Sequence, residues 1–472
     1  MELDNLFCSQ SATIKEVMTQ INENAKGTVF IVDDAGRLAG VMTDGDIRRL
    51  LIEGYGLNDY IAEHLCKNFI FAYRNDEPQT IRNKFNHRIR IIPIVDEDKR
   101  LVDYVEYSGN IHMSLAQPQL SGNEYKYLMD AFLSTWISST GKYVTQFEEN
   151  FARYCGTGYG VATSNGTTAI HLALAALGIG VGDEVIVPDL TFAATINAVI
   201  YTGATPVIVD IEEDSWCIDP EAIEKAITPA TKAVIPVHIY GQPCNMGEIC
   251  RIARENALYI IEDCAEAHGA EWQNKKVGSF GTISCFSFFG NKVVTTGEGG
   301  MCVTDSMELN EKMRILRDHG MSKERKYYHE VIGFNYRMTN LQAAIGAAQV
   351  ERIDDILNWR EALEKQYRDV FSNIGGVTIQ RNDLADRKKI TWLVSILVEG
   401  RKREQVLSEL KKQGVDVRAF FIPLSEMAIY KQYARGCIRS KKISQQGLNL
   451  PTTYEVNRER IESIAAVITS VL

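Results

Sequence analysis

Ser287-Phe-Phe-Gly-Asn-Lys292, followed by Val293-Val-Thr-Thr-Gly-Glu-Gly-Gly300, is the segment of the chain from which the chemistry can be inferred. The lysine follows a β-rich run over residues 282–289 and precedes a glycine-rich turn. A lysine at the end of a rigid strand can form an imine with an aldehyde if its amine stays partly neutral. Most lysines are solvated surface groups, so this segment alone leaves both interpretations open.

An apolar run that ends in a carboxylate lies upstream of the lysine. Ile260-Ile-Glu-Asp-Cys-Ala-Glu266 places Asp263 at the C-terminal end of a predicted strand, the edge at which open α/β sheets bind ligands. A buried carboxylate there needs a cationic partner, and a protonated ring nitrogen would supply one. A helix N-cap and a buried ion pair are the alternatives.

Two further strand-to-helix junctions carry polar or aromatic side chains. In Ser164-Asn-Gly-Thr-Thr-Ala-Ile170, the first N–H groups of a helix and the hydroxyls of Thr167 and Thr168 form a candidate phosphate cradle. In Asp189-Leu-Thr-Phe192, the phenylalanine could lie flat on an aromatic cofactor, although a phenylalanine at such a place is commonly part of the core.

Strand and helix patterns alternate from residue 158 onward. This alternation predicts a mostly parallel sheet covered by helices on both faces. A long helical stretch over 340–371 then leads to a smaller α/β subdomain. The expected strands are 158–164, 184–188, 206–211, 233–240 and 258–263, the expected helices between them are 167–177, 192–201, 221–227 and 246–256, and the final subdomain has strand 391–398, helix 404–412 and strand 415–420.

The first part of the chain contains an internal repeat. Ile31-Val-Asp-Asp-Ala-Gly-Arg-Leu38 returns as Ile94-Val-Asp-Glu-Asp-Lys-Arg-Leu101, which predicts two packed copies of one α/β unit over residues 1–113. The first copy continues into Thr43, Asp44 and Asp46 at a strand-to-helix turn, where a hydroxyl and carboxylates could hold a nucleotide. A purely architectural domain that mediates assembly is the alternative.

Bulk composition excludes several classes of protein. The chain has 472 residues and a formal net charge of -10, which disfavours partners such as nucleic acid or an anionic membrane. The N-terminus does not resemble a signal peptide, and no apolar stretch is long enough to span a bilayer. None of the ten cysteines forms a CxxC pair, so we expect free thiols, no metal site and a cytoplasmic location.

The order of these signals, from phosphate turn to Gly-Glu-Gly-Gly, resembles the DegT/StrS nucleotide-sugar aminotransferases over residues 118–472. These are enzymes of the aspartate-aminotransferase (type I) fold whose cofactor is pyridoxal 5'-phosphate (PLP). The resemblance implies a PLP-binding large domain over 118–355 and a small C-terminal α/β subdomain over 356–472. Residues 1–113 resemble a pair of CBS modules, a family that often binds adenine nucleotides and regulates the attached enzyme.

The resemblance also implies roles for individual residues. Gly333-Phe-Asn-Tyr-Arg-Met338 matches the family's GxNxRM motif, and its asparagine would reach the cofactor phosphate of a neighbouring subunit, which implies a homodimer. Glu266 stands where the family often has His or Gln near the cofactor hydroxyl. The implied set is Lys292 as the Schiff-base lysine and proton shuttle, Asp263 on the pyridinium, Thr167, Thr168 and Ser287 on the phosphate, Phe192 on the ring, Glu266 near the hydroxyl, and Asn335.

The implied reaction moves an amino group from glutamate to C4 of a nucleotide-linked 4-keto-6-deoxy sugar, chiefly GDP-4-keto-6-deoxymannose, for surface polysaccharide such as O-antigen lipopolysaccharide. Ser425, in Arg418-Ala-Phe-Phe-Ile-Pro-Leu-Ser425, replaces a common family histidine and leaves the sugar open. A UDP-linked keto-sugar is one alternative, and a non-catalytic, nucleotide-sensing PLP protein is another. Sugar 3-dehydrases of the family carry histidine at the position of Lys292, which favours amination here.

Overall fold

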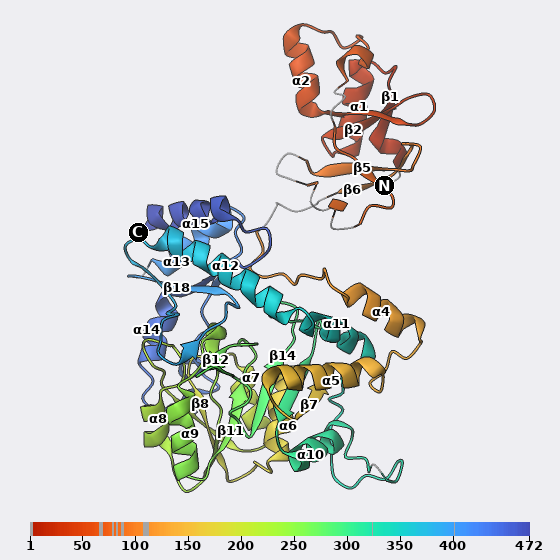
Figure 1. Ribbon diagram of the computed structural model, residues 1–472. Coiled ribbons are helices and arrows are strands. Elements are labelled where there is room, and N and C mark those ends of the chain that lie inside the picture. Colours follow the sequence, from red (N-terminus) through yellow and green to blue (C-terminus); the bar gives the residue numbers. More distant parts are fainter. Residues whose placement is uncertain are drawn as a thin grey trace. The chain divides into compact units, whose positions relative to one another are not determined.

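The computed structural model describes residues 3–65, 69–77, 80–81, 84–85, 89–106, 113–322, 324–400 and 402–472 (Figure 1). The chain forms two compact units, Met1–His112 and Met113–Leu472. The predicted division of the second unit at residue 355 stays a prediction. Among the described helices, none has both the length and the apolar character needed to cross a membrane.

The N-terminal unit contains two small sheets with the same topology. In each sheet the first strand pairs parallel with the second, and the second pairs antiparallel with the third. The amide of Leu38 donates to the carbonyl of Lys99 at 2.9 Å, and Phe30 packs with Ile91 and Val95. The structure therefore confirms two packed copies, with β1 (Phe7–Ser9), β2 (Thr28–Val32), β3 (Leu38–Thr43), β4 (Ala72–Tyr73), β5 (Ile91–Val95) and β6 (Leu101–Glu106), helices α1 (Ile14–Asn24) and α2 (Asp44–Glu53), and 3-10 turns η1 (Leu3–Leu6) and η2 (Ala62–His64).

The second unit is built on a seven-stranded sheet with the order β7-β15-β14-β11-β10-β8-β9. Only β15 runs antiparallel to its neighbours, so the expected mostly parallel sheet is confirmed. The strands are β7 (Tyr159–Thr163), β8 (Glu184–Pro188), β9 (Thr205–Val209), β10 (Thr231–Val234), β11 (Tyr259–Asp263), β14 (Ile283–Ser287) and β15 (Gly300–Thr304).

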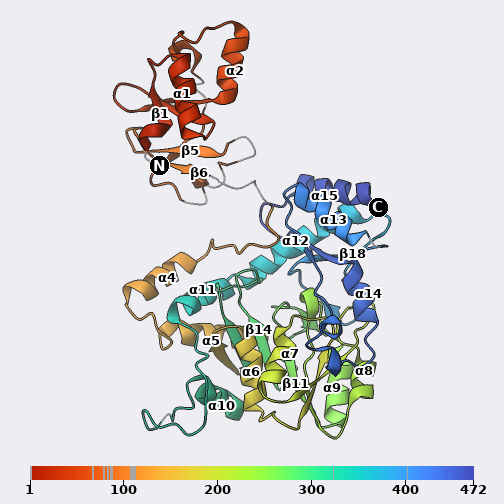
Figure 2. The same cartoon turned by 180° about the vertical axis from the view of Figure 1, so that it is seen from behind.

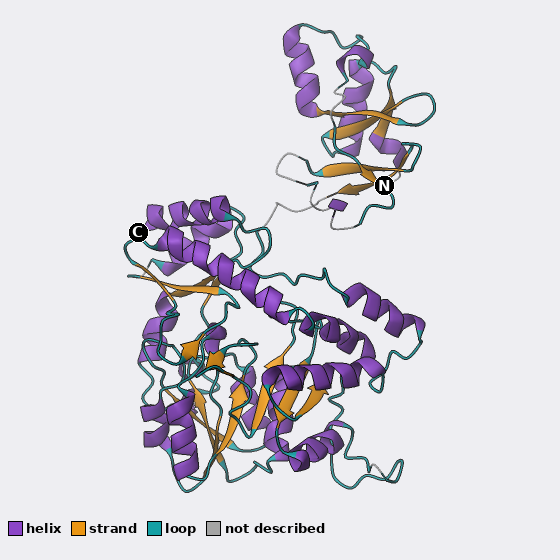
Figure 3. Cartoon of the chain, in the orientation of Figure 1, coloured by secondary structure: helices purple, strands orange, loops and turns teal. Residues whose placement is uncertain are grey.

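Helices bury both faces of this sheet, as Figures 2 and 3 show. Along β8 the side chain of Ile186 enters one core, whereas those of Val185 and Val187 enter the other. This alternation explains why the strand is apolar at successive positions. Helices α5 (Lys142–Cys155), α8 (Pro220–Ala226), α9 (Met246–Glu255) and α11 (Asn340–Val350) contribute to the first core, α6 (Gly166–Ala176), α7 (Ala194–Tyr201) and α10 (Met307–Arg317) to the second, and α4 (Glu124–Leu133) packs on α11.

The C-terminal part forms a four-stranded antiparallel sheet, β16-β18-β20-β19, covered by helices. A smaller sheet, β13-β12-β17, lies within the same unit. The remaining elements are β12 (Glu271–Trp272), β13 (Lys275–Lys276), β16 (Val377–Ile379), β17 (Arg387–Lys388), β18 (Val394–Val398), β19 (Arg418–Ala419), β20 (Gly447–Leu450), α12 (Ile353–Phe371), α13 (Arg403–Lys412), α14 (Arg439–Gln446), α15 (Arg458–Val471), η3 (Ile239–Gly241), η4 (Leu424–Glu426) and η5 (Lys431–Tyr433).

Three expected elements differ most from the structure. The helix expected over 340–371 is two helices, because the backbone at Arg352 leaves the helical region with φ -122°. Strand β10 ends at Val234 instead of residue 240, and Pro236, which has no N–H to donate, lies just beyond that end. The last expected strand shortens to β19, which pairs with β20 over two residues only.

Candidate active site

Lys292 lies in the segment between β14 and β15, with its side chain 12% exposed. Its Nζ is 3.7 Å from Oε1 of Glu266 and 4.0 Å from the ring centroid of Trp392. Burial lowers the pKa of the lysine amine, although the charges of Glu266 and Asp263 oppose this shift. The amine is therefore enclosed and more easily deprotonated than that of a surface lysine.

Asp263 ends β11, and its carboxylate is buried. It accepts hydrogen bonds from the Thr195 hydroxyl at 2.8 Å and from the Ala265 N–H at 3.1 Å. Among the described residues, no lysine, arginine or histidine nitrogen lies within 4.0 Å of it. Burial raises the pKa of the Asp263 carboxyl, so a cation placed beside it would be favoured.

Glu266 is held on its other oxygen by the main chain. The N–H of Tyr240 donates to Oε2 at 2.8 Å, which leaves Oε1 facing Lys292. Tyr240 has φ 51°, a left-handed conformation that is uncommon for a non-glycine residue and found at functional sites. Burial raises the pKa of the Glu266 carboxyl to about 7, against the opposing charge of Lys292.

The start of α6 lies against the end of β14. A Cβ atom added to Gly166 would stand 2.8 Å from the Cβ of Ser287, so these two elements touch. Asn165 caps the helix, and its side chain accepts from the N–H of Thr168 at 2.9 Å. The hydroxyl of Thr168 donates to the Asn165 carbonyl at 2.8 Å, so that its proton is already engaged within this cap.

The remaining first-turn groups of α6 are better placed for an anion. Amide N–H groups in the first turn of a helix have no partner within the helix. Within the described part of the chain, the N–H groups of Gly166 and Thr167 make no hydrogen bond, and neither does the Thr167 hydroxyl. The helix N-terminus therefore offers donors beside Ser287.

Phe192 follows β8 and is 59% exposed, which rules out the alternative that it is a core residue. Its ring lies 5.8 Å from that of Phe421. Asn335 is also exposed. Its segment is fixed by the Ser164 N–H, which donates to the Tyr336 carbonyl at 2.8 Å, so the GxNxRM segment lies beside the turn that precedes α6.

Sequence reasoning missed the structural role of Asp189. Its buried carboxylate accepts from the Ser425 N–H at 2.7 Å and the Ser425 hydroxyl at 2.8 Å, and the Ser440 hydroxyl also donates to it. Asp189 thus ties the C-terminal segment to the end of β8. Tyr240 and Trp392 were also missed, and no spacing in the sequence connects either one to Lys292.

In the N-terminal unit, the residues predicted to bind a nucleotide take part in a helix cap. Thr43 precedes α2, and its hydroxyl and N–H donate to Oδ2 of Asp46 at 2.7 and 2.8 Å. Asp44 pairs with Arg48, and Asp46 pairs with Arg49. Nucleotide binding by these residues stays a prediction.

A buried group of His238, Glu262 and Cys264 brings potential metal ligands within 4.8 Å of one another. Both histidine nitrogens are already bonded, to Glu262 at 3.1 Å and to the Cys244 N–H at 3.0 Å. Glu262 also accepts three backbone N–H groups and the Ser284 hydroxyl. Hydrogen bonds therefore account for this cluster.

Comparison with known proteins identifies both parts of the chain. Residues 118–469 match the DegT/DnrJ/EryC1/StrS aminotransferase family, and residues 1–53 match the CBS domain. The chain belongs to the DegT/DnrJ/EryC1/StrS aminotransferase family. It is a PLP-dependent enzyme that combines this aminotransferase fold with an N-terminal CBS region.

Individual relatives agree with this assignment. The GDP-perosamine synthase of Caulobacter vibrioides is 44% identical over 364 residues, which are 76% of this chain and 98% of that protein. The GDP-perosamine synthase of Escherichia coli O157:H7 is 42% identical over 351 residues, or 74% of this chain and 96% of that protein. Among solved structures, the Helicobacter pylori aminotransferase PseC superposes with a TM-score of 0.72 at 28% identity, covering 76% of this chain and 99% of that chain.

The cofactor also fits the residues of this structure. PLP combines an aldehyde, a ring nitrogen that accepts a proton and a phosphate. The site provides an enclosed amine on Lys292, a buried carboxylate on Asp263 without a cationic contact among the described residues, and free N–H groups at the start of α6. These three features match the three functional groups of PLP.

Proposed function

We propose that this enzyme transfers the amino group of glutamate to C4 of GDP-4-keto-6-deoxymannose. The observation that carries the proposal is one shared edge of the sheet, where Lys292, Asp263 and the start of α6 come together. Three GDP-perosamine synthases, at 40 to 44% identity, support the choice of sugar. The product would enter surface polysaccharide such as O-antigen, and we place the enzyme in the cytoplasm.

Lys292 and Asp263 would hold the two reactive ends of the cofactor. When bound, PLP supplies an electron sink for the carbon that loses a proton. Asp263 would keep the ring nitrogen protonated, since its buried carboxylate favours a neighbouring cation. Ser287, Thr167 and the first N–H groups of α6 would hold the phosphate, and Thr168 would act chiefly through its capping of that turn.

Lys292 would also move the proton between the amino-acid Cα and the cofactor. Burial lowers the pKa of its amine, so the amine gives up and takes back a proton more readily than that of a surface lysine. Glu266, 3.7 Å away, would share a proton with the amine because burial raises its pKa to about 7.

Two exposed residues would complete the site in a homodimer. Phe192 presents its ring at the end of β8, where it would stack on the cofactor. Asn335 would reach the phosphate in the neighbouring subunit, as the GxNxRM motif implies, and its exposed side chain is compatible with that role. The domain limits that we propose are 1–113, 118–355 and 356–472, with Thr43, Asp44 and Asp46 as an adenine-nucleotide site in the first.

A UDP-linked keto-sugar is the second candidate substrate. The UDP-N-acetyl-3-dehydro-alpha-D-glucosamine 3-aminotransferase of Acidithiobacillus ferrooxidans is 38% identical over 324 residues, 68% of this chain and 86% of that protein. Ser425, which stands where a histidine is common in the family, donates its hydroxyl to Asp189 at 2.8 Å.

A coupled assay for 2-oxoglutarate, with mass spectrometry of the sugar product, tests the proposal. The full-length enzyme receives glutamate and either GDP- or UDP-linked 4-keto-6-deoxy sugar, and amination of the GDP-sugar is expected. Lys292→Ala should abolish turnover and the visible absorbance of bound PLP, whereas Lys225→Ala, 77% exposed on α8, should change neither. Amination of the UDP-sugar alone would overturn the choice of nucleotide, and an active Lys292→Ala enzyme would overturn the site.

A further inference from the structure

The ring of Trp392 covers the amine of Lys292. The Nζ lies 4.0 Å from the ring centroid, well within the range in which an ammonium is attracted to the face of an indole. The tryptophan is 5% exposed and precedes β18, in the C-terminal part of the chain. The lysine thus has a second neighbour besides Glu266, and it comes from a segment a hundred residues away in sequence.

The edge of the indole is fixed to the same segment that carries the lysine. Its Nε1–H donates to the carbonyl of Asn291 at 2.8 Å, and Asn291 directly precedes Lys292. The ring also lies nearly parallel to that of Tyr240, with centroids 6.3 Å apart and 19° between the planes. The N–H of Tyr240 also donates to Glu266. Tyr240 therefore contacts both Trp392 and Glu266, the two side chains that lie beside the Lys292 amine.

The backbone of Trp392 is anchored to α12. Buried Arg360 and Thr452 donate to the Trp392 carbonyl at 2.8 and 3.0 Å. One residue earlier, the Thr391 hydroxyl donates to Glu364 of α12.

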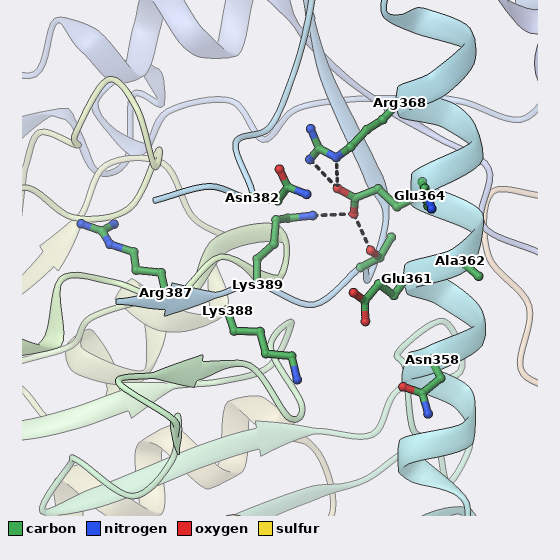
Figure 4. Close-up of a pocket in the computed structure, with 11 residues that line it drawn as sticks. Asn358, Glu361, Ala362, Glu364, Arg368, Asn382, Arg387, Lys388 and Lys389 are labelled. Atoms are coloured by element: carbon green, nitrogen blue, oxygen red, sulfur yellow. Dashed lines mark hydrogen bonds and ion pairs between the residues drawn. The ribbon is translucent and has the colours of Figure 1, made fainter. Parts of the chain in front are cut away.

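Glu364 and Thr391 line a cavity of about 480 Å³ between α12 and β17. Figure 4 shows Glu364 with the residues around it. The carboxylate of Glu364 accepts from Lys389 at 2.6 Å and also from Arg368 and Thr391. The buried contacts of Glu364 with Lys389 and Thr391 hold the segment that leads to Trp392. The indole is therefore fixed through its backbone as well as through its Nε1–H.

We propose that Trp392 is a positioning residue for Lys292, which holds the free amine against its ring face and within reach of Glu266. The inference rests on the proposed role of Lys292 in binding PLP. Whenever the amine is released from the cofactor, it needs a defined place from which it can return a proton. The negative face of the indole provides that place and stabilises the ammonium form, while the ring excludes water.

This arrangement has a measurable consequence for the lysine alone. Leucine in place of Trp392 keeps apolar volume over the amine but removes the negative ring face. The ammonium then loses stabilisation while its burial persists, so the pKa of Lys292 should fall by about one unit, a tenfold change in acid dissociation. Phenylalanine keeps a ring face and should move the pKa by roughly half of that or less.

The experiment measures the amine in the full-length protein after PLP has been removed. Acylation of Lys292 by an amine-specific reagent is followed across pH by peptide mass spectrometry, for wild type, Trp392→Leu and Trp392→Phe. Trp359→Phe is the matched control, because Trp359 stacks on Tyr454 at 3.6 Å instead of facing Lys292. The reactivity midpoint, the pH at which Lys292 is half-reactive, should be highest in wild type, lower in Trp392→Phe and lowest in Trp392→Leu. In the Trp359→Phe control it should equal that of wild type.

A second measurement avoids any risk that the leucine variant misfolds. Replacement of all five tryptophans by fluorotryptophan withdraws electron density from the ring face with little change in shape. The midpoint of Lys292 should again fall, and more with two fluorines than with one. A midpoint that stays constant or rises in both experiments overturns the inference. Because neither uses PLP or a sugar, this failure is distinct from failure of the aminotransferase assay.

Discussion

Gly166→Ala tests whether the contact between α6 and β14 forms the phosphate site. The added Cβ would stand 2.8 Å from the Cβ of Ser287 and 3.3 Å from its Oγ. Ordinary contacts begin near 3.4 Å, so the helix start and the strand end must separate by about 0.6 Å or more. A phosphate bound by the helix start and the strand end together would then lose its contacts with one of the two.

The magnitude follows from the stiffness of packed interiors. Overpacking by one methyl group costs about 1–3 kcal/mol. Without PLP the start of α6 can move away from β14 and relieve part of this strain. Binding of PLP requires the start of α6 and the end of β14 to lie close together, so it restores the strain. We therefore expect the Kd for PLP to rise by roughly 10- to 100-fold, measured by absorbance titration of the cofactor-free enzyme.

Gly375→Ala is the matched control, because a Cβ at Gly375 meets no atom within 4 Å. Ser287→Gly supplies the second arm of the test. In that background Gly166→Ala should cost little, since the atom it strikes has been removed, and the two changes should be strongly non-additive. A Gly166→Ala enzyme that binds PLP as tightly as wild type would refute a phosphate site at this contact.

Two carboxylates of the site give further predictions. Asp263→Asn should lower kcat by about a thousandfold, because a neutral amide cannot keep the ring nitrogen protonated. The 2-oxoglutarate assay measures this kcat, and a loss of less than tenfold would contradict the role of Asp263. For Glu266 burial raises the pKa to about 7, so in the cofactor-free enzyme its contribution to stability is complete at low pH and is lost as pH rises through 7. Urea unfolding at about pH 5 and pH 8 measures how much the free energy of unfolding falls between these pH values. In Glu266→Gln this fall should be smaller by roughly 2 kcal/mol, and a fall equal to that of wild type would contradict the raised pKa of Glu266.

Much of the fold could be predicted because its signals are local. Strand β8 has apolar side chains at successive positions since the sheet is buried on both faces, and this pattern is visible in the sequence. The break at Arg352 was missed because helix-forming residues continue on both sides of it. What separates α11 from α12 is their packing on different partners, α5 and α4 for the first and α15 for the second.

The site was predictable to the extent that it lies at strand ends. Asp263 and Ser287 end neighbouring parallel strands, so the topology alone brings them to one edge. Tyr240 and Trp392 could not be found in this way. Tyr240 acts through a backbone N–H in a left-handed conformation, and Trp392 acts across the boundary with the C-terminal part, so neither role depends on a local pattern.

The N-terminal unit shows how one motif can have two meanings. Thr43 and Asp46 form a capping box at α2, and Thr13 and Glu16 form an equivalent box at α1. A helix cap therefore explains a threonine followed by an acid three positions later, with or without a ligand.

A binding experiment on the full chain separates these meanings. Removal of either acid, in Asp46→Ala or Glu16→Ala, should destabilise the N-terminal unit by about 1 kcal/mol through its cap. If Asp46 also holds a ribose, adenosine monophosphate should raise the Tm of wild type and of Glu16→Ala, but not that of Asp46→Ala. We expect this selective loss, because a bound nucleotide needs the Asp46 oxygen that now accepts from Thr43. An equal rise in all three proteins would place the nucleotide elsewhere, and no rise in any would leave Asp46 with the cap alone.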